Sequence, residues 1–595
     1  MTDSAHAPSV QAIIEDLRNE DEFIRNHAMN KLSTIAIALG YSRTREDLLT
    51  YLLECTDDDS DTVLLSLATQ LGCLVDYVGG PTYAFSILPV LSQLLSQEEV
   101  TVRNAASTSF SKIVSAMPSE HISEHVIPLI DQLYAGFFTT KASICNLLPV
   151  IFSHCDSSVH NSVLVYFQKL TKDGNPMVRR SAIKSMPTLI TSVSESLSAS
   201  PQLLEIYRTF LGSLKQLSED EQDSVRLLGV EVVGALASVF AKLNDRSTVA
   251  DFDSLVVLAK AFCSDRSWRV RYVCGDCFEG IVRSFAQTKA AKLPLLVREF
   301  RTLLTDVEQE VRAAAANRII AIGKAVPPEV CVSELVPQFR HLANDDSAVV
   351  RATFAPALLE LCEVLPSDVV KKELLPLHKI LLRDSSADVR LAVISHLDAV
   401  YSKFSGALNE ALIPAVAALS GDNSWRIRLK LIEQLNLLAH QFEPEFFKNN
   451  LLTICFGGLS DIVHAVREAS AVQLAILCKT FGDSWAMGVV YPPVVALKES
   501  KSYLLRISML KCLSEMALVL SQDVVAKKLL PLAIDLADDR VPNVRFNAVK
   551  TLEVFASKIS SSSIDSFVYP LLKRLSNDDV DYDVRDLANT ALKNC

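Results

Sequence analysis

DSSADVR, residues 384–390, is the stretch that decides the fold, because the chain repeats it. Polar, turn-forming residues come first, a Val-Arg pair follows, and an apolar stretch with helical spacing comes next. DDSAVVR at 345–351 and DRSWRVR at 265–271 repeat the pattern. We interpret each copy as the turn between two antiparallel helices and the start of the second helix. Asp and Ser are typical N-caps, since their oxygens accept hydrogen bonds from first-turn amides, and we expect that role here.

The apolar residue of the Val-Arg pair, here called the anchor, recurs fifteen times along the chain. Most steps are 38–41 residues, and two steps of 47 and 45 residues predict insertions in the loops around repeats five to seven. Arg follows the anchor in thirteen copies, Lys141 in one and Leu64 in one, and Thr140 is assigned by spacing alone. The anchors are Ile24, Val63, Val102, Thr140, Val178, Val225, Val270, Val311, Val350, Val389, Ile427, Val466, Leu505, Val544 and Val584.

A recurrent proline keeps the same phase as the anchors. It lies 13 residues before six of them, at Pro89, Pro337, Pro376, Pro414, Pro492 and Pro531. This spacing places the proline inside the first helix of each pair, where it removes a backbone hydrogen bond and is expected to bend the helix. Two independent markers in one register indicate a true structural repeat.

The period and the apolar spacing together predict an all-α superhelix. Apolar residues recur every three or four positions on both sides of the turn in repeat ten, at Val370, Leu374, Leu377 and Leu381, then at Val389, Val393, Leu397 and Val400. A period near 39 with two helices per repeat is close to that of HEAT-class solenoids, in which neighbouring repeats must stack to bury their apolar faces. We therefore expect one array of about 15 HEAT repeats over residues 8–595.

Composition restricts the possible partners and compartment. The chain has 595 residues, a net charge of −12 and no long basic run, which argues against nucleic acid as the main partner. Residues 1–10 are polar and no run of 18 apolar residues occurs, so neither a signal sequence nor a membrane span is expected. The thirteen cysteines form no disulfide-like framework. These features indicate the cytosol and leave the nucleus open.

No motif for catalysis or for a cofactor stands out. The acidic run 57–61 could suggest a cation site, but it lacks the glycine and distal glutamate of an EF-hand loop, so a solvated helix N-terminus is the favoured interpretation. The pair Cys274 and Cys277 has no second Cys/His pair near it in the sequence and is interpreted as structural. Gly323-Lys324 lacks the other glycines of a phosphate loop. We expect no enzyme activity, no metal and no cofactor.

Two turns contain a tryptophan where small polar residues would be expected. Trp268-Arg269 and Trp425-Arg426 occupy equivalent positions in repeats seven and eleven. Packing against the next repeat would explain them. The alternative is an exposed anchor for a partner, because Trp and Arg are common interface hot spots. The sequence leaves both explanations open.

Four of these segments resemble the scaffold (A) subunit of protein phosphatase 2A. The segments are DEQDSVRLL at 220–228, DRSWRVRY at 265–272, PMVRR at 176–180 and NVRFN at 543–547. Fifteen HEAT repeats over residues 8–593 also fit that family. The resemblance implies a non-catalytic, horseshoe-shaped protein whose turns form one continuous ridge. Repeats 11–15, about residues 400–595, would bind the phosphatase catalytic subunit, and repeats 1–8, about residues 8–320, an exchangeable regulatory B-type subunit.

The resemblance also assigns individual positions on this ridge. The expected catalytic-subunit contacts are Trp425, Arg426, His464, Tyr503, Leu504, Arg506, Val541 and Asn543. The expected regulatory-subunit contacts are Glu98, Glu99, Pro176, Arg179, Arg180, Ser224, Trp268 and Arg269. The chain departs from the family pattern at Gly174, where an acidic residue is usual, and at His464, where an aromatic residue is usual.

The resemblance implies a heterodimeric core that becomes a heterotrimer when a regulatory subunit binds. Two other hypotheses compete with it. A HEAT-repeat nuclear-transport or adaptor protein would share the fold, but it does not predict the two S-W-R turns. A hydrolase with a helical fold would need a convergent catalytic group, and the sequence contains none that we can identify.

Overall fold

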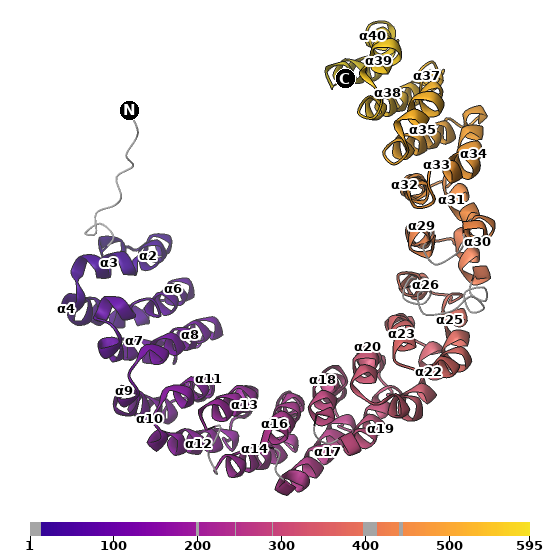
Figure 1. Cartoon of the computed structure of the whole chain (residues 1–595). Coiled ribbons are helices and arrows are strands. Elements are labelled where there is room, and N and C mark those ends of the chain that lie inside the picture. The colour runs from indigo at the N-terminus through magenta and orange to yellow at the C-terminus, as the bar shows by residue number, and fades with distance from the viewer. Residues whose placement is uncertain are drawn as a thin grey trace, which may run out of the picture. The chain divides into compact units, whose positions relative to one another are not determined.

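The computed structural model describes residues 14–197, 202–243, 246–287, 290–396, 413–439 and 444–594. Within these ranges the chain forms α-, 3₁₀- and π-helices and no β-strand, so the all-α prediction is confirmed. The chain divides into two compact units, unit 1 from Met1 to Val326 and unit 2 from Pro327 to Cys595. Figure 1 labels the helices of both units.

Unit 1 contains repeats one to eight. The first helices of its repeats include α5 (Leu49–Glu54), α7 (Leu88–Leu94), α10 (Ile127–Ala135), α12 (Ser157–Thr171), α14 (Leu203–Ser218), α17 (Val249–Cys263) and α19 (Leu293–Leu303). The second helices are α2 (Glu22–Met29) with α3 (Leu32–Leu39), α6 (Asp61–Leu71), α8 (Val100–Ala116), α11 (Phe138–His154), α13 (Pro176–Ser196), α15 (Asp223–Arg226) with α16 (Gly229–Leu243), α18 (Trp268–Ala286) and α20 (Gln309–Ala325).

Unit 2 contains repeats nine to fifteen. Its first helices include α22 (Val336–Ala343), α25 (Leu375–Leu381), α30 (Pro444–Asn450) with α31 (Leu452–Gly458), α34 (Tyr491–Ala496), α37 (Leu530–Leu536) and α40 (Tyr569–Asp578). The second helices are α23 (Ala348–Glu360), α26 (Ala387–Ile394), α29 (Trp425–Ala439), α32 (His464–Phe481), α35 (Tyr503–Ala517), α38 (Pro542–Ala556) and α41 (Tyr582–Asn594). Leu397 and Val400, which were expected on the second helix of repeat ten, lie outside the described residues.

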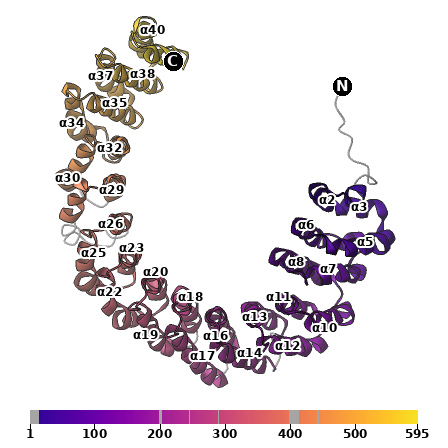
Figure 2. The same ribbon diagram turned by 180° about the vertical axis from the view of Figure 1, so that it is seen from behind.

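The helices stack in two layers within each unit. Second helices pack on second helices, as in α11 on α13, α16 on α18, α32 on α35 and α35 on α38. First helices form the other layer, as in α14 on α17 and α17 on α19. Figure 2 shows both rows from behind. Contacts therefore join nearest-neighbour repeats, which is the arrangement of a solenoid.

The anchors lie at the centre of this packing. Thirteen of the fifteen are buried, and Ile24 and Leu505 are half-buried. Thr140, the anchor assigned by spacing alone, is buried, and its hydroxyl donates to the carbonyls of Leu133 and Phe137 at 2.7 Å each. An internal hydrogen bond lets this polar side chain occupy an apolar position.

Four of the six recurrent prolines, Pro337, Pro376, Pro492 and Pro531, follow a π-turn, whereas Pro89 follows the 3₁₀-helix η4 (Pro81–Ile87). In repeat nine the amide of Val336 donates to the carbonyl of Cys331, five residues back, and Pro337 comes next. A wider turn gives the proline ring room where it would otherwise crowd the carbonyl four residues back. The short α-turn and π-turn pairs are α4 (Tyr41–Arg43) and η1 (Thr44–Leu48), α9 (Ser119–His121) and η5 (Ile122–Val126), α21 (Pro328–Val330) and η8 (Cys331–Leu335), α24 (Ser367–Val369) and η10 (Val370–Leu374), α33 (Asp483–Trp485) and η12 (Ala486–Val490), α36 (Gln522–Val524) and η14 (Val525–Leu529), and α39 (Ser561–Ser563) and η15 (Ile564–Val568).

Short 3₁₀-helices complete the described elements. They are η2 (Cys55–Asp57), η3 (Val75–Val78), η4 (Pro81–Ile87), η6 (Arg246–Thr248), η7 (Ala290–Lys292), η9 (Leu361–Glu363), η11 (Leu419–Gly421) and η13 (Leu497–Glu499). The longer step after repeat five coincides with α13, which has 21 residues. The inter-repeat residues 198–201 and 244–245 lie outside the described ranges.

One segment, Asp223–Leu243, is long and apolar enough to cross a membrane by length and composition alone. It comprises α15 and α16, which pack against α13, α14, α17 and α18. Most of its apolar window is buried against these neighbours, as in the core helix of a folded solenoid.

The register can be tested at Val389, which is fully buried at the start of α26. Val389→Asp removes a buried apolar side chain and buries a carboxyl group, which should lower the free energy of unfolding locally by about 3 kcal/mol or more. We expect new protease cleavage sites in repeats nine to eleven, mapped by mass spectrometry. Asp388→Asn, a change at the exposed neighbour, is the matched control. Wild-type resistance of the Val389→Asp protein would contradict the register.

Candidate functional site

The turns between paired helices are joined by a repeated ion pair. In repeat ten, Arg390 donates from Nε to Asp422 Oδ2 at 2.7 Å and from Nη2 to Asp422 Oδ1 at 3.0 Å. Its third nitrogen, Nη1, donates to the backbone carbonyl of Asp384 at 2.5 Å. The arginine therefore holds its own turn and the turn of the next repeat at the same time.

We call each such pair a rung and the series the Arg–Asp ladder. The rungs within unit 1 are Arg25–Asp58, Arg179–Asp220, Arg226–Asp265 and Arg271–Asp306, with Lys141–Asp173 as a lysine variant. Those within unit 2 are Arg351–Asp384, Arg390–Asp422, Arg428–Asp461, Arg506–Asp539 and Arg545–Asp579. The Lys141–Asp173 distance of 3.1 Å places Lys141 in the arginine position, which confirms the register of repeat four.

The expected N-cap role of these Ser residues is wrong for the three turns at 384–390, 345–351 and 265–271. Ser386 occupies the N-cap position of α26, but its side chain makes no capping hydrogen bond, and the same holds for Ser347 and Ser267. The aspartate instead folds the turn: Asp384 Oδ1 accepts from the amide of Ser386 at 2.8 Å. Its carboxylate is also shared with the arginine of the preceding repeat, which is why Asp is suited to this position.

The rungs perturb the ionisation of their carboxyl groups. Hydrogen bonds from Arg428 and Arg545 are the largest influence on Asp461 and Asp579 and lower the pKa of each. At Asp265, burial acts to raise the pKa, but the hydrogen bond from Arg226 and a backbone amide outweigh it and lower the pKa. These groups remain ionised at neutral pH because the charged form is the one that the turn binds.

Among the described residues of the two units, three positions interrupt the ladder. Leu64 replaces the arginine of repeat two, and Gln97 stands at the facing aspartate position. Arg103 faces Ala135, and burial lowers its pKa, in contrast to the raised pKa of arginines within rungs such as Arg226.

The third interruption lies in unit 2, where Arg467 faces Ser500. Arg103 and Arg467 still donate to their own turn carbonyls, at Gln97 and Asp461 respectively. Each arginine therefore keeps the hydrogen bond to its own turn and lacks the ion pair with the next turn.

The acidic run at 57–61 contributes Asp58 to the Arg–Asp ladder. Asp58 binds Arg25 at 2.8 Å, and the Ser60 hydroxyl accepts from the amide of Val63 as a true N-cap. In the part of the chain that the structure describes, no group of three or more His, Cys, Asp or Glu residues could hold a metal ion.

The C-x-x-C pair lies inside α18. Cys274 is buried 3.6 Å from the sulfur of Cys263, and burial raises the pKa of Cys277 to about 11. The pKa of Cys274 is raised as well, by its hydrogen bond with Cys263 and by burial. Both thiols are therefore neutral at physiological pH, which is unfavourable for nucleophilic or metal-binding roles.

The residues predicted to bind a catalytic subunit lie at the starts of the second helices in unit 2. His464, Tyr503, Leu504 and Asn543 are exposed, as is Arg426, whereas Trp425 and Val541 are half-buried. Arg506 is an exception, because it is 6% exposed and forms the rung with Asp539. The structure gives Arg506 a role in holding the turns.

The residues predicted to bind a regulatory subunit occupy the equivalent row in unit 1. Glu98, Arg180, Trp268 and Arg269 are exposed, and Glu99, Pro176 and Ser224 are half-buried. Pro176 is the first residue of α13, and Glu99 caps α8 by accepting from the amide of Thr101. Arg179 is engaged in the rung with Asp220.

Both tryptophans remain accessible at the turns. Trp268 is 38% exposed and lies edge-on to Tyr272, with the ring centroids 6.4 Å apart. The guanidinium carbon of Arg269 lies 5.3 Å from the Trp268 ring centroid, and that of Arg426 lies 4.9 Å from the Trp425 ring centroid. Each turn therefore presents a cation–π pair at the surface.

Several exposed apolar residues on the same turns were not predicted. Phe137 is 81% exposed at the turn of repeat four, and Phe138 follows it on α11. Ile462, Val307 and Val580 each lie four residues before an anchor and are almost fully exposed. The sequence analysis selected the tryptophans because each is an apolar residue in an otherwise polar turn. The same criterion, applied to every turn, would have selected these residues as well.

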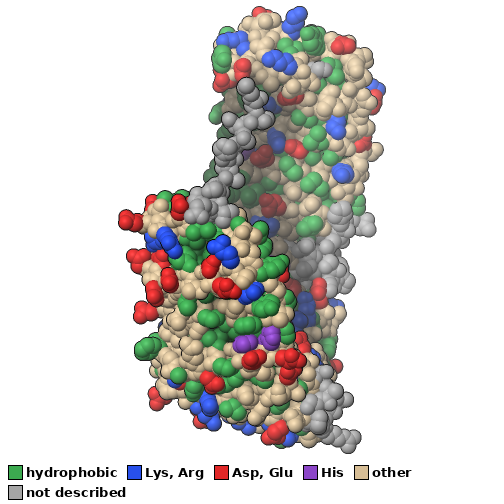
Figure 3. Space-filling view, turned by 90° about the vertical axis from the view of Figure 1, so that its left-hand side faces the viewer, with side chains coloured by type: hydrophobic (Ala, Val, Ile, Leu, Met, Phe, Trp, Pro, Cys, Tyr) green, Lys and Arg blue, Asp and Glu red, His purple; other side chains and the backbone are tan. Residues whose placement is uncertain are grey.

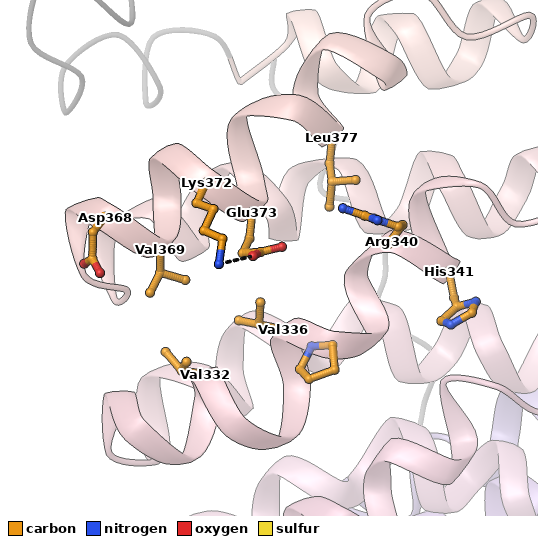
Figure 4. A pocket seen from close by; sticks show the side chains of 10 residues that line it. Val332, Val336, Arg340, His341, Asp368, Val369, Lys372, Glu373 and Leu377 are labelled. Carbon is orange, nitrogen blue, oxygen red and sulfur yellow. Dashed lines mark ion pairs between the residues drawn. The ribbon is translucent and has the colours of Figure 1, made fainter.

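The first-helix layer contains open grooves. Figure 4 shows one of about 520 Å³ in unit 2, lined by Val332 and Val336 on one side and by Val369, Lys372 and Glu373 on the other. A second groove of about 460 Å³ in unit 1 includes His125, which stacks on Phe85 at 4.1 Å. Figure 3 shows histidine side chains beside hydrophobic and acidic ones on this unit. Neither groove presents a nucleophile, base and orienting group together.

Comparison with known proteins gives relatives named as PP2A regulatory subunits. The family model described as "PPP2R1A-like HEAT repeat" matches residues 289–365 and 328–399. The PP2A regulatory A subunit of Saccharomyces cerevisiae is 35% identical over 280 residues, and its Schizosaccharomyces pombe counterpart is 36% identical over 271. The predicted resemblance to PP2A A subunits is confirmed. These alignments span 47% and 45% of this chain and less than half of each relative, 43% and 44%.

A further relative has the same kind of name, and solved structures share the fold. The beta isoform of the 65 kDa regulatory A subunit of protein phosphatase 2A from Rattus norvegicus is 39% identical over 178 residues, 30% of each chain. Among solved structures, importin beta gives a TM-score of 0.61 at 12% identity over 99% of this chain and 77% of its own. Kap121p bound to Ste12p gives 0.61 at 14% identity over 96% of this chain and 58% of its own. At such identity these structures support the HEAT-type solenoid fold alone.

The ladder predicts a local loss of stability when one partner is removed. Asp265→Ala leaves the Arg226 side chain, 5% exposed, buried without its carboxylate. This should cost about 3 kcal/mol locally, and amide exchange in α16 and α18 should accelerate about 100-fold. Asp346→Ala, at an exposed carboxylate in an equivalent turn, is the control. Unchanged exchange in the Asp265→Ala protein would show that the rung does not hold the two repeats together.

The lowered carboxyl pKa values predict an acid-dependent loss of stability. A group whose folded-state pKa lies below its unfolded value, about 3.9 for Asp, stabilises the fold fully above that value and less as pH falls through the folded pKa. Asp220, Asp265, Asp384, Asp461, Asp539 and Asp579 all have lowered pKa values. The melting temperature should therefore fall steeply below about pH 4. A constant melting temperature from pH 7 to pH 3 would contradict this.

Proposed function

We propose that this chain is a non-catalytic scaffold subunit of a Ser/Thr protein phosphatase 2A complex. The observation that carries the proposal is the similarity to several proteins named as regulatory subunits of PP2A, at 35–39% identity. Regulatory subunits bind other proteins and need no catalytic group of their own.

The proposal assigns the catalytic subunit to repeats 11–15. The supporting observations are the exposed side chains at the first turns of α32 and α35, His464, Tyr503 and Leu504, and the cation–π pair of Arg426 with Trp425. Aromatic and arginine side chains on rigid turns are typical of interface centres. The ladder supplies rigidity at the Trp425 turn, which two charge-assisted hydrogen bonds tie to its neighbour on each side, through Arg390–Asp422 and Arg428–Asp461.

The proposal assigns an exchangeable regulatory B-type subunit to repeats 1–8. The exposed pair Trp268 and Arg269, together with Arg180 and Glu98, lies on the equivalent turns of unit 1. Two partners on separate sets of turns need not compete, and sharing one scaffold raises their local concentration. We further propose a cytoplasmic location, consistent with the absence of disulfide bonds among the described cysteines.

A nuclear-transport role is the second candidate because the solenoid resembles karyopherins in fold. Affinity capture from lysate followed by mass spectrometry separates the two. The scaffold proposal predicts a Ser/Thr phosphatase catalytic chain as the dominant captured protein. Capture of a small GTPase and transport cargo, without the phosphatase, would favour the transport role.

The two tryptophans allow a paired test of the proposal. Trp425→Ala should weaken binding of the phosphatase catalytic subunit by at least about 2 kcal/mol and leave regulatory-subunit binding unchanged. Trp268→Ala should do the converse. Titration of each variant with each purified partner measures both effects, and the melting temperature serves as the control for folding. A sharp fall in melting temperature with intact phosphatase binding would show that Trp425 is a packing residue.

A further inference from the structure

One rung in unit 2 has its arginine but not its aspartate. Arg467 donates from Nη1 to the carbonyls of Asp461 at 2.8 Å and Ile462 at 3.1 Å. Arg390 makes the same pair of contacts in an intact rung, at 2.5 and 3.1 Å. The position that holds Asp in the neighbouring rungs is Ser500. Within the described ranges, no ion pair of Arg467 is found.

Ser500 makes the same turn hydrogen bonds as the aspartates of the rungs but has no negative charge. Its hydroxyl accepts from the amide of Ser502 at 3.2 Å, as the turn aspartates accept from the amide two residues on. Its carbonyl accepts from Arg506 Nη1 at 2.7 Å, as in other rungs. Because the backbone framework of the rung is preserved, the Nε–Nη2 edge of Arg467 is a carboxylate-binding fork without a carboxylate from its own chain.

Arg467 also lines a small pocket across three second helices. The pocket has a volume of about 250 Å³ and is lined by residues of α32, α35 and α38: His464, Arg467, Glu468, Ile507, Ser508, Lys511, Asn547 and Lys550. Three of these side chains are cationic and one is anionic. The site is thus locally positive in a chain with a net charge of −12.

The other two cations of the pocket already have neighbours. Lys511 pairs with Glu468 at 3.2 Å and with Glu515 at 2.8 Å. Lys550 lies 4.8 Å from the centroid of the Phe546 ring. Among the described residues, Arg467 and Lys550 have no ion pair, and of the two the planar fork of Arg467 is the one suited to a carboxylate.

We propose that Arg467 binds an acidic side chain of the phosphatase catalytic subunit. This inference rests on the proposed scaffold function. Charge and position both favour the catalytic subunit as the source of the carboxylate. The fork is suited to a carboxylate, His464 lines the same pocket, and Tyr503 is exposed on the next of the turns assigned to that subunit. A bound partner completes the interrupted rung.

Restoring the missing aspartate tests the proposal directly. In the Ser500→Asp protein, the introduced carboxylate should occupy the fork of Arg467 from within the chain. The melting temperature should rise, and the affinity for the purified catalytic subunit should fall at least tenfold, because the partner's carboxylate then meets a filled fork and a like charge. Ser500→Asn keeps the turn hydrogen bond without the charge, so its affinity should stay within about twofold of wild type.

The outcomes separate this inference from the scaffold proposal. If the wild-type chain binds the catalytic subunit, Trp425→Ala weakens binding and Ser500→Asp does not, the inference is wrong and the scaffold proposal stands. If the wild-type chain shows no binding to the catalytic subunit, both are wrong.

A free anion is the other source of the same chemistry. Titration of the chain alone with inorganic phosphate tests it. Stabilisation of the wild-type chain but not of Ser500→Asp at or below about 1 mM phosphate would assign the fork to a small anion and overturn the proposal. No stabilisation at that concentration supports a side chain of the partner.

Discussion

The bidentate ion pair between an arginine of one repeat and an aspartate of the next is the interaction on which the rest of this structure depends. Each arginine donates to a carbonyl of its own turn and to the carboxylate that folds the following turn. Arg390, for example, donates to the backbone carbonyl of Asp384 and to the carboxylate of Asp422. Buried ion pairs contribute little net stability compared with apolar packing, but they specify geometry. The ladder therefore fixes the register of repeats that apolar packing alone would leave free to slide.

This constraint explains why the turns can serve as a binding surface. A solenoid has no single deep core or active-site cleft, and its equivalent turns recur along one edge. The rungs make that edge rigid where they are intact, so exposed side chains such as Trp268, Arg269 and Arg426 are presented without the entropic loss of ordering a free loop. The interruptions at Arg103 and Arg467 are places where the edge has unused bonding capacity of its own.

The fold was predictable because the anchors and prolines share one period, and the burial of Val389 and Thr140 follows from it. The ladder was not predicted. Asp384 has a sufficient local explanation as a helix cap, and its true partner, Arg351, lies 33 residues away in sequence. The family resemblance assigned Arg179 and Arg506 to partner contacts, and the structure shows both of them in rungs. From the sequence alone, an arginine in a turn could bind a partner or the next repeat. Only the residues that surround each arginine in the structure distinguish these two roles.

The central claim is that one chain carries two proteins at once on separate sets of turns. The most direct measurement is the mass of the assembly formed when the purified chain is mixed with a B-type regulatory subunit, together with the catalytic subunit of PP2A, determined by light scattering after size-exclusion chromatography. One particle with a single copy of each protein is the expected result. Mutual displacement of the two partners, or no binding of the catalytic subunit, would contradict it.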